Sequence, residues 1–163
     1  MGVKAMFLLG EKLDGRDGHL VGRELLAKLY TRATGEPLPE ISVTSNGKPY
    51  FADGKWHFSI SHTKQYAFCA LSRQNIGLDA EEKGRKVSET MVEKFASSGE
   101  KSRLGEDPQD AFLRLWVLKE AYAKLTGRGI GNWLKNTDFD PFDQRIQEIY
   151  GCYVAVLEEE YAV

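Results

Sequence analysis

The chain has 163 residues, enough to bury a hydrophobic core as one domain or as two small halves that share it. Its apolar fraction of 42% and charged fraction of 28% are those of an ordinary globular protein. A net charge of −2 provides no overall attraction to nucleic acid or to an anionic membrane, so a basic site for a phosphorylated ligand has to be local. Because the chain has no apolar run of membrane-spanning length and no signal-peptide core, we expect a soluble, cytoplasmic protein.

The first half of the sequence predicts a strand, a helix, a short strand and a strand hairpin. The expected elements are a strand at 5–9, an amphipathic helix at 20–33, a short strand at 41–44 and paired strands at 56–61 and 66–71. The loop of this hairpin is predicted at His62. A short polar segment follows, and we therefore divide the chain into an N-terminal half, 1–74, and a C-terminal half, 75–163.

The second half predicts one long helix between shorter elements. Asp107 is a capping residue before a proline, and Gly127 is a stop signal, so these residues delimit the helix. The other expected elements are a strand at 76–81, a helix at 88–96 and strand-like segments at 139–142, 144–149 and 153–157. The two cysteines, Cys69 and Cys152, lie in apolar runs without metal-ligand spacing, and we expect both to be buried and reduced.

Acidic residues occur at two places where their spacing is informative. Asp79 and Glu81 are two apart on the predicted strand, so they point the same way. Glu120 and Lys124 are four apart on the long helix and share one face. Three carboxylates beside a lysine would suit a Mg²⁺ ion on a pyrophosphate, because Mg²⁺ prefers oxygen ligands. The alternative is an ordinary charged surface with a routine helical ion pair.

Four blocks of sequence occur in order between residues 46 and 130. They are Asn46-Gly47-Lys48-Pro49-Tyr50, Phe58-Ser59-Ile60-Ser61-His62-Thr63, Ile76-Gly77-Leu78-Asp79-Ala80-Glu81 and Trp116-Val117-Leu118-Lys119-Glu120-Ala121-Tyr122-Ala123-Lys124. Together they resemble the signature of the 4'-phosphopantetheinyl transferase superfamily, in particular its single-chain surfactin-synthetase-activating type. The resemblance implies an α+β fold of two related halves in a pseudo-twofold arrangement, with coenzyme A in the cleft between them.

The resemblance also implies an activity. It is the transfer of 4'-phosphopantetheine from coenzyme A to a serine of an acyl, peptidyl or polyketide carrier protein, with release of adenosine 3',5'-bisphosphate. Two halves in one chain make a monomer sufficient, and we expect a monomer. The sequence does not indicate which carrier is modified.

Residue roles follow from the resemblance alone. Asp79, Glu81 and Glu120 are expected to bind Mg²⁺, for which Mn²⁺ could substitute. Lys124 is expected to stabilise charge on the transition state or leaving group. The proton of the attacking serine would go to Glu120 or to a water held by the carboxylates, and the sequence does not decide between them.

The residues expected to bind coenzyme A are Lys48, Ser61, His62, Arg16, His19 and Arg23. For the last three, solvated surface charges are the alternative. Lys119 is expected to contact a phosphate or solvent. Glu100 is expected to be either another active-site acid or a solvated residue at a helix start, and Trp116 to belong to the core.

Two other functions remain open at this point. The chain could be a non-catalytic module that binds coenzyme A or a carrier protein. It could also be a Mg²⁺-dependent pyrophosphate hydrolase, which would break down coenzyme A without a carrier.

Overall fold

The computed structural model describes residues 6–159. The elements are, in chain order, β1 (Met6–Lys12), α1 (Gly18–Thr34), β2 (Ile41–Val43), β3 (Pro49–Phe51), β4 (His57–His62), β5 (Tyr66–Ser72), β6 (Ile76–Glu82), α2 (Glu89–Phe95), α3 (Ser98–Ser102), α4 (Pro108–Thr126), the short 3₁₀ helix η1 (Asn132–Asn136), β7 (Ile146–Ile149) and β8 (Cys152–Glu158). Helices and antiparallel strands make up the predicted α+β fold. Ala5, the first residue of the first predicted strand, lies outside the described residues.

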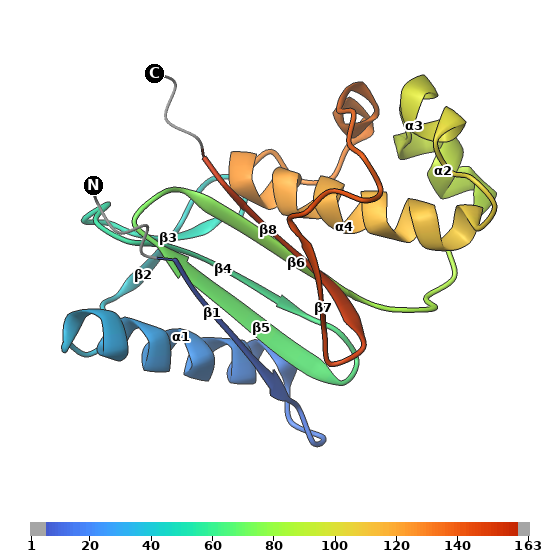
Figure 1. The fold of residues 1–163 in the computed structure, drawn as a ribbon. Coiled ribbons are helices and arrows are strands. Elements are labelled where there is room, and N and C mark those ends of the chain that lie inside the picture. The colour runs from blue at the N-terminus through green and yellow to red at the C-terminus, as the bar shows by residue number, and fades with distance from the viewer. Residues whose placement is uncertain (1–5, 160–163) are drawn as a thin grey trace.

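Two three-stranded antiparallel sheets lie between two helices (Figure 1). The first sheet has the order β1-β5-β4 and is covered on its outer face by α1. The second has the order β6-β8-β7 and is covered by α4. A small ribbon of β2 and β3 extends the first half. Each half of the chain therefore contributes one sheet and one long helix.

Alternation along the strands produces this layering, because successive side chains point to opposite faces. On β5, Cys69 and Leu71 pack towards α1, whereas Phe68 and Ala70 pack against the second sheet. Ser59 lies on the inner face of β4, where its hydroxyl accepts a hydrogen bond from the backbone N–H of Leu78 on β6. The two sheets are thus joined by apolar contacts and by serine-to-backbone hydrogen bonds.

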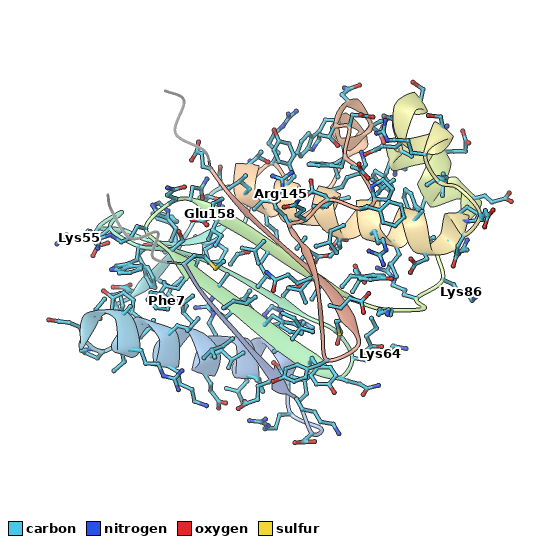
Figure 2. The ribbon with its side chains drawn as sticks, in the orientation of Figure 1. Phe7, Lys55, Lys64, Lys86, Arg145 and Glu158 are labelled. Carbon is cyan, nitrogen blue, oxygen red and sulfur yellow. The ribbon has the colours of Figure 1, made fainter. Side chains whose placement is uncertain are left out.

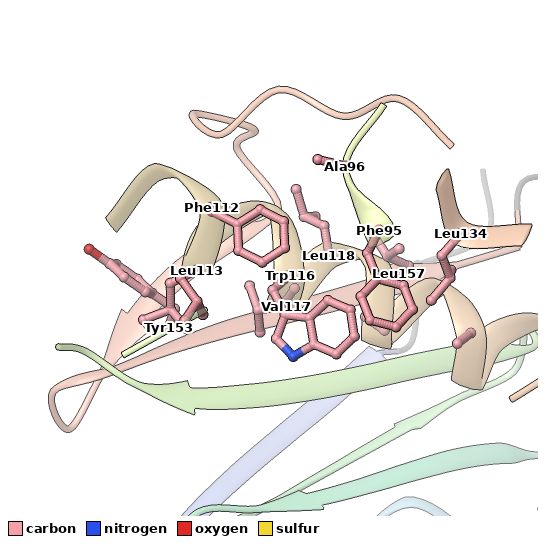
Figure 3. Close-up of a cluster of buried hydrophobic side chains, with 14 residues drawn as sticks. Phe95, Ala96, Phe112, Leu113, Trp116, Val117, Leu118, Leu134, Tyr153 and Leu157 are labelled. Carbon is pink, nitrogen blue, oxygen red and sulfur yellow. The ribbon is translucent and has the colours of Figure 1, made fainter. Parts of the chain in front are cut away.

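The core beneath α4 contains the buried aromatic side chains of Phe95, Phe112, Trp116 and Tyr153 (Figure 3). Trp116 packs against Phe95, with ring centroids 4.8 Å apart, and is only 4% exposed. Its assignment to the core is confirmed. Cys69 and Cys152 are buried and free, also as expected.

Close packing of α4 on β6 depends on Gly77. A Cβ atom at this position would overlap the carbonyl oxygen of Ala121 and lie 2.5 Å from the backbone nitrogen of Leu125. The helix therefore contacts the strand backbone directly. This contact fixes how the start of β6 is placed against the last two turns of α4, which carry Glu120 and Lys124.

The strand predicted at 139–142 is wrong. Residues 137–142 form irregular chain and a turn, because side chains occupy the backbone groups that a strand would pair. Glu100 accepts a hydrogen bond from the backbone N–H of Phe139, and Arg103 donates to its carbonyl oxygen. Within residues 6–159, no helix is both long and apolar enough to span a membrane.

Candidate metal centre and phosphate pocket

An acid cluster forms where β6 meets α4. Asp79 and Glu81 lie on the face of β6 that also carries Gly77, and Glu120 projects from α4. One carboxylate oxygen from each of the three residues lies within 4.8 Å of the other two. Asp79 is only 3% exposed, and its Oδ2 atom is buried without a hydrogen bond from any described residue. A buried oxygen with unused lone pairs, beside two further carboxylates, is the donor set of a hard divalent cation.

Burial and mutual repulsion both disfavour the ionised form of the three acids. Burial raises the pKa of Asp79 well above its usual range, against the opposing charge of Lys124, and the adjacent Glu120 raises it further. Burial likewise raises the pKa of both Glu81 and Glu120. The three acids therefore need positive charge nearby in order to ionise together.

Two cationic side chains contact the cluster. The ammonium of Lys124 lies 3.4 Å from Oδ1 of Asp79 and 3.2 Å from the carbonyl oxygen of Ile60. The guanidinium of Arg85 lies 2.7 Å from Oε1 of Glu81. The sequence predicted Lys124 at this place but missed Arg85, whose contact depends on a turn that brings it back to β6.

A pocket of about 410 Å³ opens beside the acid cluster, and both halves of the chain line it. Its polar lining residues include His19 and Arg23 of α1, Lys48 from the turn before β3, His62 at the end of β4, and Glu120 and Lys124 of α4. The pocket is thus locally basic in a protein whose net charge is −2. It offers several donors to an anionic ligand next to a possible cation site.

Lys48 joins the two halves at the pocket wall. Its ammonium donates to Oδ1 of Asn75 at 2.7 Å and to the carbonyl oxygen of Leu125 at 2.9 Å. Burial lowers the pKa of Lys48. The carbonyl belongs to the last turn of α4, where a cation is favourable because of the helix dipole.

The two histidines of the pocket lie beside each other. The rings of His19 and His62 are 5.3 Å apart in an edge-to-face arrangement, and both side chains are exposed. A Cβ atom on Gly18 would lie 2.5 Å from the His62 ring, so this glycine lets α1 approach the end of β4.

Two of the predicted coenzyme A residues lie elsewhere. Ser61 is buried, and its hydroxyl donates to Oδ1 of Asp79 at 3.1 Å, so it belongs to the acid cluster and not to the pocket lining. Arg16 donates to the carbonyl oxygens of Lys12 and Leu13 and is not brought to the pocket. Its guanidinium instead stabilises the loop between β1 and α1.

The expectations for Lys119 and Glu100 are wrong. Both side chains are fully buried and form an ion pair of 2.7 Å, so neither reaches solvent or the pocket. Lys119 also donates to the carbonyl oxygens of Leu134 and Thr137. Glu100 is the third residue of α3 and forms a capping box with the N-cap residue Ser97, a pattern that can be read from sequence as Ser-x-x-Glu.

Comparisons with known proteins agree with the signature residues. The sequence model of the 4'-phosphopantetheinyl transferase superfamily matches residues 75–161. The 4'-phosphopantetheinyl transferase gsp of Aneurinibacillus migulanus is 32% identical over 120 residues, covering 68% of this chain and 48% of the relative. Sfp of Bacillus subtilis (strain 168), also named a 4'-phosphopantetheinyl transferase, is 32% identical over 136 residues, covering 80% and 57%.

A mammalian relative matches over a longer stretch. The L-aminoadipate-semialdehyde dehydrogenase-phosphopantetheinyl transferase of Mus musculus is 30% identical over 178 residues, covering 93% of this chain and 58% of the relative. The chain spans about half the length of the curated relatives it matches. By the extent of the family match and the identity to these relatives, the chain belongs to the 4'-phosphopantetheinyl transferase superfamily.

Proposed function

We propose that this chain is a Mg²⁺-dependent 4'-phosphopantetheinyl transferase that moves phosphopantetheine from coenzyme A to a serine of a carrier protein. The observation that carries this proposal is the convergence of Asp79, Glu81 and Glu120 beside a pocket lined by cationic side chains from both halves. The names of the relatives support the same reaction. Mn²⁺ could replace Mg²⁺, since both take oxygen ligands.

The pocket offers separate contacts for separate phosphates. Lys48 and His62 would hold the 3'-phosphate of coenzyme A, and His19 and Arg23 would add positive charge at the same wall. Lys48 already uses two hydrogen-bond donors on Asn75 and Leu125. An ammonium has three donors, so one is left for a phosphate oxygen.

The proposed reaction is a phosphoryl transfer. The serine oxygen forms a bond to the phosphorus that carries pantetheine, and the bond from this phosphorus to the bridging oxygen breaks. The serine proton passes to Glu120 or to a water held by the carboxylates, and the electron pair of the broken bond leaves with adenosine 3',5'-bisphosphate. Lys124 faces the developing negative charge. Most of the rate enhancement in such reactions comes from positioning and electrostatic stabilisation.

Asp79, Glu81 and Glu120 would hold the metal ion, which supplies positive charge to the diphosphate. Ser61 keeps one oxygen of Asp79 oriented through its hydroxyl, which leaves Oδ2 for the ion. Partners of this kind orient metal-binding carboxylates in many sites.

We also propose that the two halves, 1–74 and 75–163, act as one unit. Residues of both halves line the pocket, and Lys48 of the first half donates a hydrogen bond to the carbonyl oxygen of Leu125 in the second. A monomer would then contain the complete site.

The proposal is tested by incubating an apo-carrier protein with coenzyme A, Mg²⁺ and the chain. The carrier mass is measured, and adenosine 3',5'-bisphosphate is quantified by chromatography. A transferase adds one phosphopantetheine per carrier serine and releases an equal amount of the bisphosphate. A pyrophosphate hydrolase releases the bisphosphate without a carrier, and a non-catalytic module leaves coenzyme A intact. Acyl and peptidyl carriers assayed side by side identify the preferred partner.

A further inference from the structure

Arg85 reaches the acid cluster from the side of the loop between β6 and α2. The chain turns after β6 at Gly84, whose φ is 85°, and the backbone N–H of Arg85 donates to the carbonyl oxygen of Glu82. This turn brings the guanidinium back to Glu81, with Nη1 2.7 Å from Oε1. The Glu81 side chain is 12% exposed and the Arg85 side chain 43%, so the acid is fixed in the interior and the cation is at the surface.

The acid cluster therefore lies between two cations. Lys124 approaches Asp79 from the pocket, and Arg85 approaches Glu81 from the loop. Burial disfavours the charged form of Arg85, but the ion pair with Glu81 and the charges of Glu120 and Asp79 raise its pKa overall. Arg85 thus interacts electrostatically with all three acids.

We propose that Arg85 is the counter-ion of the metal-free site: it occupies Glu81 until a divalent cation binds and then gives up this contact. The proposal rests on the metal role assigned above to Asp79, Glu81 and Glu120. A guanidinium and a divalent cation on the same carboxylate repel each other at short range. A partly exposed arginine leaves such a contact at small cost, because ion pairs near the surface are weak.

Metal binding without coenzyme A tests this role independently of transfer activity. Free Mn²⁺ is measured by electron paramagnetic resonance during titration of the metal-free chain, for the wild type, Arg85→Gln, Arg85→Lys and Lys86→Gln. Lys86 provides the matched control, because it is exposed on the same loop, where Figure 2 shows it, and carries the same charge. Circular dichroism checks that each variant is folded.

Loss of Arg85 is expected to tighten Mn²⁺ binding. Arg85→Gln should lower the Kd about fivefold, the upper range for a partly exposed ion pair. The Kd of Arg85→Lys should lie between those of Arg85→Gln and the wild type. The Kd of Lys86→Gln should stay within about twofold of the wild-type value, because the charge of Lys86 is exposed and therefore largely screened. In parallel, addition of MgCl₂ should raise the Tm of Arg85→Gln more than that of the wild type.

Three results would overturn the proposal. Unchanged binding in Arg85→Gln would mean that the ion pair does not compete. Weaker binding would mean that Arg85 orients Glu81 for the metal instead. Equally tighter Mn²⁺ binding in Lys86→Gln would mean that loss of any nearby positive charge has the same effect, so the contact with Glu81 would not be the cause. In each of these cases the wild type still binds Mn²⁺, whereas a wild type without Mn²⁺ binding refutes the metal site itself and this inference with it.

Discussion

Removal of the Lys119 ammonium should destabilise the protein severely. Lys119 and Glu100 are both fully buried. The Lys119 ammonium forms an ion pair with Glu100 and hydrogen bonds to two backbone carbonyl oxygens and to the hydroxyl of Thr137. In Lys119→Met, Glu100 would remain buried, and its hydrogen-bond partners among residues 6–159 would be the N–H groups of Ser97 and Phe139. Removal of one partner of a buried ion pair costs about 3–5 kcal/mol. A loss of this size is a large part of the stability of a typical domain.

The assay is urea denaturation followed by circular dichroism, with Lys101→Met as the matched control. Lys101 forms an ion pair with Glu93 at 2.8 Å, but the Glu93 side chain is 72% exposed. Loss of this ion pair in Lys101→Met should therefore lower the free energy of unfolding by less than about 1 kcal/mol. The double variant Lys119→Met with Glu100→Leu should recover part of the stability, because no uncompensated charge then remains buried. A loss below about 1 kcal/mol in Lys119→Met would refute the reasoning.

Three further predictions concern the site. Gly77→Ala should cost at least about 1–3 kcal/mol in chemical denaturation, because the added Cβ would overlap the backbone of α4, and unchanged stability would contradict the close contact. In the metal-free protein, Asp79→Asn should be more stable than the wild type. Because burial raises the pKa of Asp79, the native state holds its proton above the ordinary pKa of 3.8, so wild-type stability falls as the pH rises through the raised value. The difference in Tm measured in EDTA should therefore widen between pH 4 and neutrality, and a constant difference would argue against this cause. Lys48→Met should raise the KM for coenzyme A but not for 3'-dephospho-coenzyme A, and equal effects on both would exclude a 3'-phosphate contact.

Local signals in the sequence were sufficient for the long helix. Asp107 accepts a hydrogen bond from the backbone of Asp110, and Gly127 ends α4 with a φ of 72°. Both boundaries were predicted, because capping and left-handed glycine termination depend only on neighbouring residues. The direction of Asp79 and Glu81 followed in the same way from the two-residue period of a strand.

The sequence could not show which charges would be buried. Lys119 precedes Glu120 on α4 and has the same local chemistry as an exposed lysine, but it packs towards α3 and η1. Ser61 was assigned to a phosphate through its neighbour His62, yet adjacent strand residues point to opposite faces, and Ser61 faces Asp79. Arg85 was not predicted as a site residue, because its ion pair with Glu81 depends on the turn at Gly84. These outcomes depend on contacts between elements that lie far apart in the chain.

The rate of carrier modification as a function of free Mg²⁺ tests most directly whether the acids of β6 and α4 hold a catalytic cation. The carrier mass is followed over time for the wild type and for Asp79→Asn at equal enzyme concentration. We predict a saturable rise in rate with Mg²⁺ for the wild type and no transfer by Asp79→Asn, although the variant is folded. Transfer by Asp79→Asn at the wild-type rate, or a wild-type rate that does not respond to Mg²⁺ after treatment with EDTA, would contradict the account.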